Sequence, residues 1–376
     1  MRAVLLIALL VACGDDDMTL GFDAAVEDTG TDSGSDAGFD SGFDAGTDSG
    51  SDAGTDSGFD AGVDSGFDAG PATCTPEAPG ITFPSGTWNA VVAAEGAALD
   101  QPVSVDFDGD RLLVSNSASW LVISTAAGNI LEVEGTVGVL ASGASFLGPS
   151  YVAWNTGADG FAEGLYVSIE DAAGPGILAV SPDGSSVSTL GNATEPGEIE
   201  FGPGGAWGGQ LYVPARERAD AVMPNPFEVY RYDATGMRTR VAITVGGAPL
   251  VGAFVLEFGP GGALGTDLYV GTVMDTGFSP GSIPAIYRVA ADGTATEITR
   301  GFRPFGIAAP AMTAGPFGEF LYVSNGTGIT RVDADGTAEM FAETLTATAS
   351  LRFGPDGSLY LAEPGEPRVL QISPCP

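Results

Sequence analysis

Phe258–Val270 reads FGPGGALGTDLYV, a turn built on Pro and Gly that leads into the short apolar strand Leu-Tyr-Val. The same phrase returns as FGPGGAWGGQLYV at Phe201–Val213 and as FGPDGSLYL at Phe353–Leu361. Weaker copies lie at 108–114, 155–167 and 315–323. Six copies of one strand-turn unit, at intervals of about 40 to 55 residues, are typical of a β-propeller. The sequence therefore predicts an all-β fold with six blades.

Each Leu-Tyr-Val strand is followed by a second pair of strands. The turn in this pair carries Asp and Gly, as in Pro182-Asp183-Gly184, and Asp-Gly between two strands is a strong hairpin signal. The expected hairpins span 177–190, 229–241, 286–298 and 329–341. Residues 74–376 should thus form a six-bladed propeller of four-stranded blades.

The last blade contains sequence for three strands only, at 351–353, 359–361 and 369–372, after which the chain ends. Thr87–Val92 has no blade of its own, so we expect it to supply the outer, fourth strand of the last blade. Because that strand would run antiparallel to its neighbour, Cys375 would come close to Cys74. We therefore predict a Cys74–Cys375 disulfide.

Residues 1–12 have the form of a signal peptide, with Arg2 as a minimal basic region and an apolar stretch too short to span a bilayer. Leu10-Val11-Ala12-Cys13 resembles the lipobox of bacterial lipoproteins, which implies that Cys13 is lipidated and becomes the mature N-terminus. The alternative is an ordinary secretory signal with an incidental Cys. We expect a lipid-anchored protein of the cell envelope. Gly14, in place of Asp, favours the outer membrane, without fixing the face.

Residues 14–73 hold 16 acidic residues and no basic one, and Asp recurs at every fourth position from Asp32 to Asp68. A chain of Asp, Gly, Ser and Ala with one sign of charge cannot bury a core, so residues 13–73 should form a disordered spacer behind the lipid. Calcium binding by this Asp ladder is the alternative, but an EF-hand-type loop needs ligands at its positions 1, 3 and 5. Four-residue spacing does not supply them.

Composition excludes several kinds of chemistry. The net charge is −36, which disfavours nucleic acid as a partner. The 13 basic residues are all Arg, and the chain contains no His. A Ser-His-Asp triad, a His-ligated zinc site and a Lys Schiff base are therefore excluded. Any catalysis would depend on carboxylates, amides, hydroxyls, Arg or a metal bound by oxygen atoms.

The propeller region resembles the NHL-repeat propellers and the gluconolactonase-like family, also called senescence marker protein-like. The resemblance covers about 300 residues and rests on the Leu-Tyr-Val strands and on phrases such as Ile286-Tyr287-Arg288-Val289 followed by Asp292-Gly293. In the gluconolactonase-like family a calcium ion lies on the axis, held by Glu, Asn and Asp, and the Asp is the proposed base. This resemblance is good evidence for fold and poor evidence for activity.

The family's ligand positions map onto few matching residues here. The early Glu falls on Asp100, and the positions after the second strands give Asn116, Asn325 and Glu363. These four residues are the candidate calcium ligands, with Glu170, Glu217 and Asp275 nearby, and Glu363 is the candidate catalytic base. The alternative is that they are ordinary loop residues, since Asn and Glu often follow strands.

Two classes of function remain. The first is a non-catalytic lipoprotein that presents the propeller mouth to an unidentified protein or small-molecule ligand. The second is a calcium-dependent, lactonase-like hydrolase with a degenerate axial metal site. The incomplete ligand set and the long spacer favour the first class.

Overall fold

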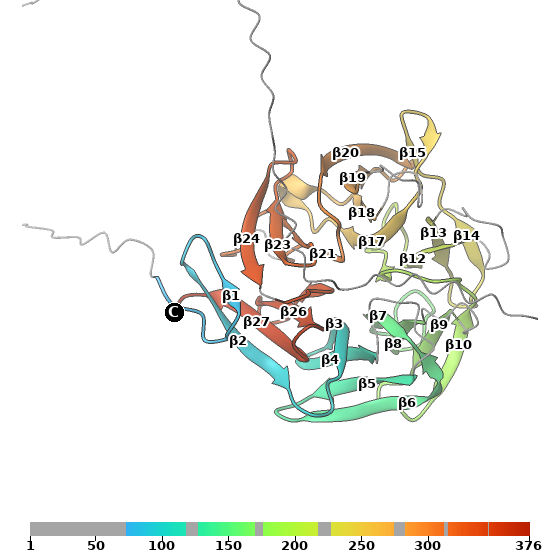
Figure 1. Cartoon of the computed structure of the whole chain (residues 1–376). Coiled ribbons are helices and arrows are strands. Elements are labelled where there is room, and N and C mark those ends of the chain that lie inside the picture. Colours follow the sequence, from blue (N-terminus) through green and yellow to red (C-terminus); the bar gives the residue numbers. More distant parts are fainter. Residues whose placement is uncertain are drawn as a thin grey trace, which may run out of the picture. The chain divides into compact units, whose positions relative to one another are not determined.

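The computed structural model describes residues 73–117, 127–169, 176–216, 227–273, 283–311, 315–344 and 346–376. Within these residues the strands form six sheets, which stand as blades around a common axis (Figure 1). The predicted six-bladed propeller is therefore confirmed. Residues 1–72, which include Cys13 and nearly all of the predicted spacer, lie outside the described residues.

In each blade four antiparallel strands follow one another from the axis outward. Blade 1 comprises β3 (Gln101–Asp108), β4 (Arg111–Ser117), β5 (Ala127–Val133) and β6 (Val137–Leu147). Blade 2 comprises β7 (Pro149–Asn155), β8 (Gly164–Ile169), β9 (Ile177–Val180) and β10 (Val187–Gly191). Blade 3 comprises β11 (Glu200–Phe201), β12 (Leu211–Arg216), β13 (Phe227–Tyr232) and β14 (Arg238–Arg240).

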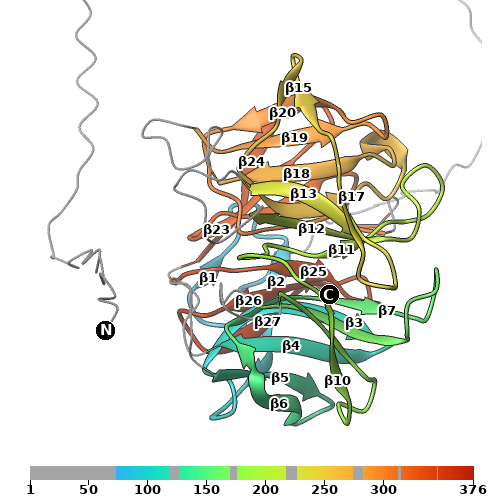
Figure 2. The same cartoon turned by 90° about the vertical axis from the view of Figure 1, so that its right-hand side faces the viewer.

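Blades 4 to 6 follow the same order, and each gains strands from elsewhere in the chain. Blade 4 comprises β17 (Ala253–Phe258), β18 (Leu268–Thr272), β19 (Ala285–Val289) and β20 (Thr294–Arg300), extended by β15 (Thr244–Val245) and β16 (Ala248–Pro249). Blade 5 comprises β21 (Gly306–Ala308), β22 (Leu321–Ser324), β23 (Gly328–Val332) and β24 (Ala338–Thr344), extended by β1 (Ile81–Thr82). Blade 6 comprises β25 (Leu351–Phe353), β26 (Leu359–Glu363), β27 (Arg368–Pro374) and β2 (Trp88–Glu95). Figure 2 shows the ring from the side, with blade 4 above and blade 1 below.

The additional strands correct the expectation of four strands in every blade. The hairpin of β15 and β16 adds to blade 4, where β15 lies parallel to β20. The short strand β1 covers the outer edge of blade 5 by pairing with β24. An outer strand offers unpaired backbone groups, and each extension satisfies some of them. The only helix in the described residues is a 3₁₀ turn at Gly262–Leu264, between β17 and β18.

The Tyr of the Leu-Tyr-Val strands explains why the motif repeats. Tyr212, Tyr269 and Tyr322 are fully buried in the second strand of their blades. Each hydroxyl donates a hydrogen bond to a carbonyl oxygen five residues earlier, at 2.6, 2.6 and 2.7 Å respectively. The ring fills the space between blades while the hydroxyl fixes the Gly/Pro turn that precedes the strand.

The hairpin glycines also hold neighbouring blades together. Gly236 has a φ of 79°, which favours Gly, and a Cβ atom placed on it would lie 1.8 Å from the carbonyl oxygen of Leu190 in blade 2. The glycines at the same point of blades 2, 4 and 5 make the same close approach to the preceding blade, at 1.9, 2.0 and 1.9 Å: Gly184, Gly293 and Gly336. The Asp-Gly turns are therefore contacts between blades as well as hairpin turns.

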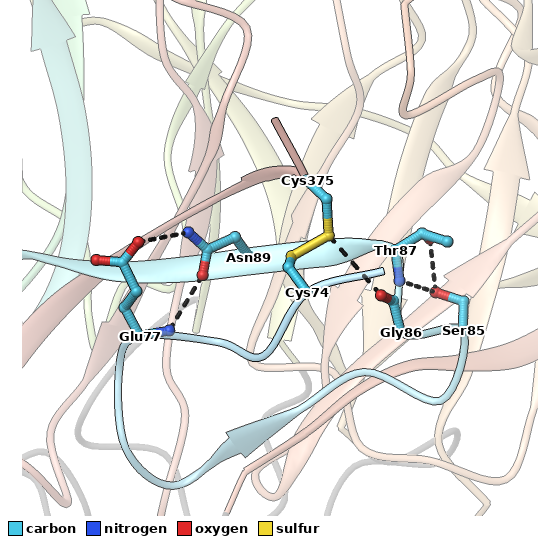
Figure 3. Close-up of a disulfide and its surroundings, with 7 residues drawn as sticks. All are labelled: Cys74, Glu77, Ser85, Gly86, Thr87, Asn89 and Cys375. Atoms are coloured by element: carbon cyan, nitrogen blue, oxygen red, sulfur yellow. Dashed lines mark hydrogen bonds between the residues drawn. A yellow bond between two sulfur atoms is a disulfide. The ribbon is translucent and has the colours of Figure 1, made fainter. Parts of the chain in front are cut away.

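The ring closes as the sequence predicts. β2 pairs antiparallel with β27, with Trp88 opposite Pro374, so the N-terminal strand completes blade 6. Cys74 and Cys375 form a disulfide with a Cα–Cα distance of 5.9 Å (Figure 3). Backbone hydrogen bonds of 3.0 Å flank the disulfide, from Cys74 N to Gly86 O and from Cys375 N to Thr87 O.

None of the helices among the described residues is long and apolar enough to span a membrane.

Candidate functional site on the propeller axis

One equivalent position in the first strand of every blade lies at the same level of the propeller axis. It is the residue paired with the middle residue of the Leu-Tyr-Val strand, or of Leu-Leu-Val in blade 1. In blade order these residues, which we call the axial ring, are Asp106, Ala153, Glu200, Glu257, Ala308 and Arg352. The first strand of a blade lies closest to the axis. Three carboxylates and one guanidinium are thus brought to one level of the axis.

Arg352 contacts all three carboxylates of the axial ring. Its Nη1 and Nη2 atoms lie 2.5 and 3.1 Å from the two oxygens of Glu200. The Nε atom lies 3.3 Å from Asp106 Oδ1, and Nη1 lies 3.5 Å from Glu257 Oε2. The grip on Glu200 is bidentate, the strong geometry for a guanidinium and a carboxylate. A side chain of blade 6 can reach blades 1, 3 and 4 together only at the centre of the ring.

A second layer of polar groups, Ser104, Glu198 and Ser350, stands two residues before the axial-ring residues of blades 1, 3 and 6. Ser104 Oγ donates to Ser350 Oγ at 3.4 Å, and Ser350 Oγ donates to Glu198 Oε1 at 3.5 Å. The backbone N–H of Leu256 donates to Glu198 Oε2 at 3.1 Å. All three side chains of this polar layer are buried. The layer connects blades 1, 3 and 6 by hydrogen bonds.

Burial dominates the electrostatics of these carboxyls. It raises the pKa of Glu198 well above the usual value, and the nearby negative charge of Glu200 adds to the effect. Burial and then repulsion from Glu200 raise the pKa of Glu257 in the same way. Burial also raises the pKa of Glu200, although the charge of Arg352 opposes it. The axis therefore holds carboxyls that retain protons at higher pH than exposed ones do.

Arg352 stays charged in this setting. Burial lowers its pKa, but the charges of Glu200, Asp106 and Glu257 raise it further, so that the net pKa lies well above the usual value. Its side chain is 27% exposed, and those of Asp106, Glu200 and Glu257 are 9, 13 and 12% exposed. The cluster is thus a largely buried cation among more carboxyls than one charge can neutralise.

An aromatic side chain crosses the axis at the level of the polar layer. Tyr151, on β7 of blade 2, donates a hydrogen bond from its hydroxyl to the carbonyl oxygen of Phe305 at 2.8 Å. Phe305 directly precedes β21 of blade 5, which lies opposite blade 2 in a ring of six. The Tyr151 ring also meets Phe254 of blade 4 edge-on, with centroids 6.0 Å apart. The axis is therefore filled here by side chains of opposite blades.

The candidate calcium ligands are each engaged within their own part of the fold. Asn116 Oδ1 accepts the backbone N–H groups of Asp100 and Gln101 at 2.8 and 3.0 Å. Its Nδ2 donates to the carbonyl oxygen of Ala98 and to Asn129 Oδ1. Asn116 thus fixes the segment that leads into β3. Asp100, predicted as the early ligand, takes part here through its backbone N–H.

Asn325 has a similar local role in blade 5. Its Nδ2 donates to Thr330 Oγ1 at 2.9 Å, and its Oδ1 accepts the backbone N–H of Thr327 at 3.3 Å. These bonds shape the turn between β22 and β23. The amide oxygen of Asn325 thus accepts a hydrogen bond from the turn that follows it.

Glu363, the candidate base, is fully buried at the end of β26. Its Oε2 lies 2.6 Å from Arg368 Nε, and Thr346 Oγ1 donates to its Oε1 at 3.4 Å. Arg368 in turn donates to the carbonyl oxygen of Pro79 at 2.8 Å. Burial raises the pKa of Glu363, and Arg368 opposes this. Glu363 therefore anchors the N-terminal segment to blade 6, and substrate would have to displace Arg368 to reach it.

These residues do not fit a calcium ion. Calcium needs six to eight oxygen ligands around one point. Asn116, Asn325 and Glu363 instead bond to groups of three different blades, and within the described part of the chain no group of three or more Asp, Glu or Cys side chains is arranged to hold a metal. On the axis itself a guanidinium stands among the carboxylates. Glu170, Glu217 and Asp275 lie outside the described residues.

The axial ring was missed in the sequence, although a signal for it is present. The residue that directly precedes Phe in the Phe-Gly-Pro phrase is Glu200, Glu257 or Arg352. In blade 1 the corresponding residue is Asp106, which precedes Phe107 just before the weaker copy at 108–114. The Gly and Pro residues of this phrase predict a turn, and they say nothing about the charged residue that precedes it. The charged residue in front of it becomes informative only when the copies are aligned and the opposite signs are compared.

No protein-family model and no curated protein matches this chain. Solved structures of gluconolactonase-like propellers resemble it. A gluconolactonase from Xanthomonas campestris is 18% identical, with a TM-score of 0.54, and the match covers 81% of this chain and 97% of that one. A putative gluconolactonase is 16% identical, with a TM-score of 0.53 and coverage of 78% and 93%.

A further similar structure carries a different kind of description. It is an auxiliary nutrient binding protein from Bacteroides thetaiotaomicron, 12% identical, with a TM-score of 0.51 and coverage of 73% of this chain and 69% of that one. At these identities the likeness establishes the propeller fold. It agrees with the resemblance inferred from the Leu-Tyr-Val strands.

Proposed function

We propose that this chain is an exported lipoprotein, anchored through Cys13, that presents its propeller as a non-catalytic binding module. The apolar segment before Cys13 and the acidic residues 14–73 support anchoring at a distance from a membrane. The fold is compatible with this role, since similar propellers include both a gluconolactonase and a nutrient binding protein. The choice between binding and catalysis must therefore come from the site.

The observation that carries the proposal is what fills the axis. Hydrolysis at this position would need a carboxylate or a metal-bound water that substrate can reach. Arg352 instead holds the axial carboxylates, and Tyr151 crosses the channel to Phe305. Glu363 is buried against Arg368. A ligand would thus bind to surfaces of the ring, since among the described residues Arg352 engages the axial carboxylates and Arg368 engages Glu363.

The second candidate is a lactonase-like hydrolase, and one observation favours it. Glu198 and Glu257 are buried carboxyls whose pKa values lie well above the usual range. Carboxyls tuned in this way are what general acids and bases require near neutral pH. If the protein is a hydrolase, the proton would therefore move through Glu198 or Glu257, and substrate would have to enter the axial channel.

Turnover of a panel of lactones by the full mature chain separates the two functions. We expect no turnover above the uncatalysed rate, either with calcium or with a chelator. Turnover that is lost in Glu257→Gln or Glu198→Gln, and kept in an exposed control such as Glu343→Gln, would establish the hydrolase. Turnover that requires calcium and is lost in Glu363→Gln would restore the site expected from the family resemblance.

A further inference from the structure

The axial ring binds a cation that belongs to the chain itself. Asp106, Glu200 and Glu257 come from blades 1, 3 and 4, and the Arg352 guanidinium lies within 3.5 Å of an oxygen of each. Arg352 is carried by blade 6, which completes the ring. One positive charge thus meets carboxylates from three other blades.

Without a cation, these carboxylates would repel one another in a poorly solvated space. Their side chains are 9 to 13% exposed, and Glu198 lies one layer further along the axis. Like charges at short range in a protein interior are strongly unfavourable, and a buried charge that loses its partner is costly. A positive charge at the centre of the ring therefore lowers the cost of keeping these carboxylates ionised.

The shape of the cluster suits a guanidinium better than a metal ion. Glu200 meets the Nη1 and Nη2 atoms side by side, which matches the planar fork of Arg. The Nε atom points toward Asp106, on another edge of the same plane. A calcium ion would instead require oxygens converging on one point at about 2.3 to 2.6 Å.

We propose that Arg352 is a built-in cation: the axial carboxylates form a cation site that the chain fills with its own side chain, so that the propeller closes without a bound metal. This assignment departs from the calcium ion that the family resemblance implies for the axis. It is independent of whether the protein is a binding module or a hydrolase. It makes a specific demand, namely that the site should accept another cation once Arg352 is shortened.

Thermal unfolding of the full chain with Arg352→Ala tests this demand. We expect the melting temperature to fall by about 5 to 10 °C, since a buried ion pair loses one partner. Low-millimolar guanidinium should restore part of the loss, because it matches the planar fork that Arg352 presents to Glu200. Sodium chloride at equal ionic strength should not. The wild-type protein should respond neither to calcium nor to a chelator.

Arg331→Ala is the matched control, because Arg331 pairs with one carboxylate, Glu339, which is 52% exposed. Guanidinium should not restore that variant. The proposal is overturned if guanidinium raises the melting temperature of Arg352→Ala no more than sodium chloride does. It is also overturned if a chelator lowers the melting temperature of the wild-type protein.

A second comparison serves if Arg352→Ala fails to fold. Glu200→Gln with Glu257→Gln removes two of the negative charges that require a cation. In that background Arg352→Met should lower the melting temperature at most half as much as it does in the wild-type chain. If Arg352→Met alone does not fold, adding Glu200→Gln and Glu257→Gln should restore folding. An equal loss in both backgrounds would show that Arg352 acts through packing and not as a cation.

Discussion

Arg352 Nη1 and Glu200 Oε2 lie 2.5 Å apart although 152 positions separate the two residues in the chain. The pair joins blade 6 to blade 3, on the opposite side of the ring. Tyr151 and Phe305 join blades 2 and 5 in the same way, through a hydrogen bond across the axis. The blades of a propeller otherwise pack mainly against their neighbours, so these links add contacts across the diameter of the ring.

The hairpin glycines give a direct test of how blades pack. We expect Gly236→Ala to lower the free energy of unfolding by about 3 kcal/mol, because the left-handed backbone disfavours Ala and the new methyl would strike Leu190 O. Gly204→Ala is the matched control: its φ of 88° is similar, and a Cβ atom there would have nothing within 4 Å. It should cost about 1 kcal/mol. Equal losses in urea unfolding would show that the approach between blades is unimportant.

The disulfide should contribute strongly to stability. Cys74 and Cys375 are separated by 301 positions, so the bond restricts a very long loop in the unfolded chain. On the chain-entropy model, a loop of 100 residues already gives about 4.7 kcal/mol. We expect reductant to lower the melting temperature of the wild-type protein and to leave the Cys74→Ala/Cys375→Ala variant unchanged. Free thiols at both positions in protein purified without reductant would refute the bond.

Lipidation of Cys13 is tested by the mass of the mature protein. Cleavage after Ala12 and acylation of the new N-terminus should leave a chain that begins at Cys13 and carries acyl groups. Cys13→Ser is the control, since it should no longer be acylated and should leave the membrane fraction. A wild-type protein recovered in soluble form, without a modified Cys13, would contradict the proposed anchor.

The sequence predicted the parts of the fold that repeat. Leu-Tyr-Val strands, Gly/Pro turns and Asp-Gly hairpins each have a local physical cause, and their recurrence revealed the blade count. The closure by β2 and the Cys74–Cys375 bond followed from counting strands in the last blade. The short strands β1, β15 and β16 were missed because two-residue strands leave too little periodicity to detect.

The candidate site was harder to predict because it depends on side chains that differ between blades. Asn116 and Asn325 looked like ligands from their position after a strand, yet their amides bind nearby backbone and side-chain groups. Glu363 is held by Arg368, five residues further along the chain. The contact of Arg352 with Glu200 depends on ring geometry, which no local pattern specifies. Only an alignment of all six copies of the repeat would have placed Arg352 and Glu200 at the same level of the propeller axis.

The axial carboxyls predict an unusual dependence of stability on pH. Burial raises the pKa of Glu198 and Glu257 well above the value of 4.5 that applies in the unfolded chain. Their contribution to stability is therefore fully present below about pH 4.5 and is lost as the pH rises through the folded-state values. We expect the free energy of unfolding, followed through the urea midpoint, to fall as the pH rises above about 4.5, by about 1.4 kcal/mol for each unit of pKa shift.

The double variant Glu198→Gln/Glu257→Gln isolates this effect, because an amide stays neutral across the whole range. Its midpoint should depend less on pH than that of the wild-type protein, and the two curves should separate as the pH rises. Glu343→Gln/Glu366→Gln removes two charges from exposed positions and serves as the control for net charge. If the curve of the axial variant runs parallel to those of the wild type and of this control, the buried carboxyls do not hold protons as their surroundings imply.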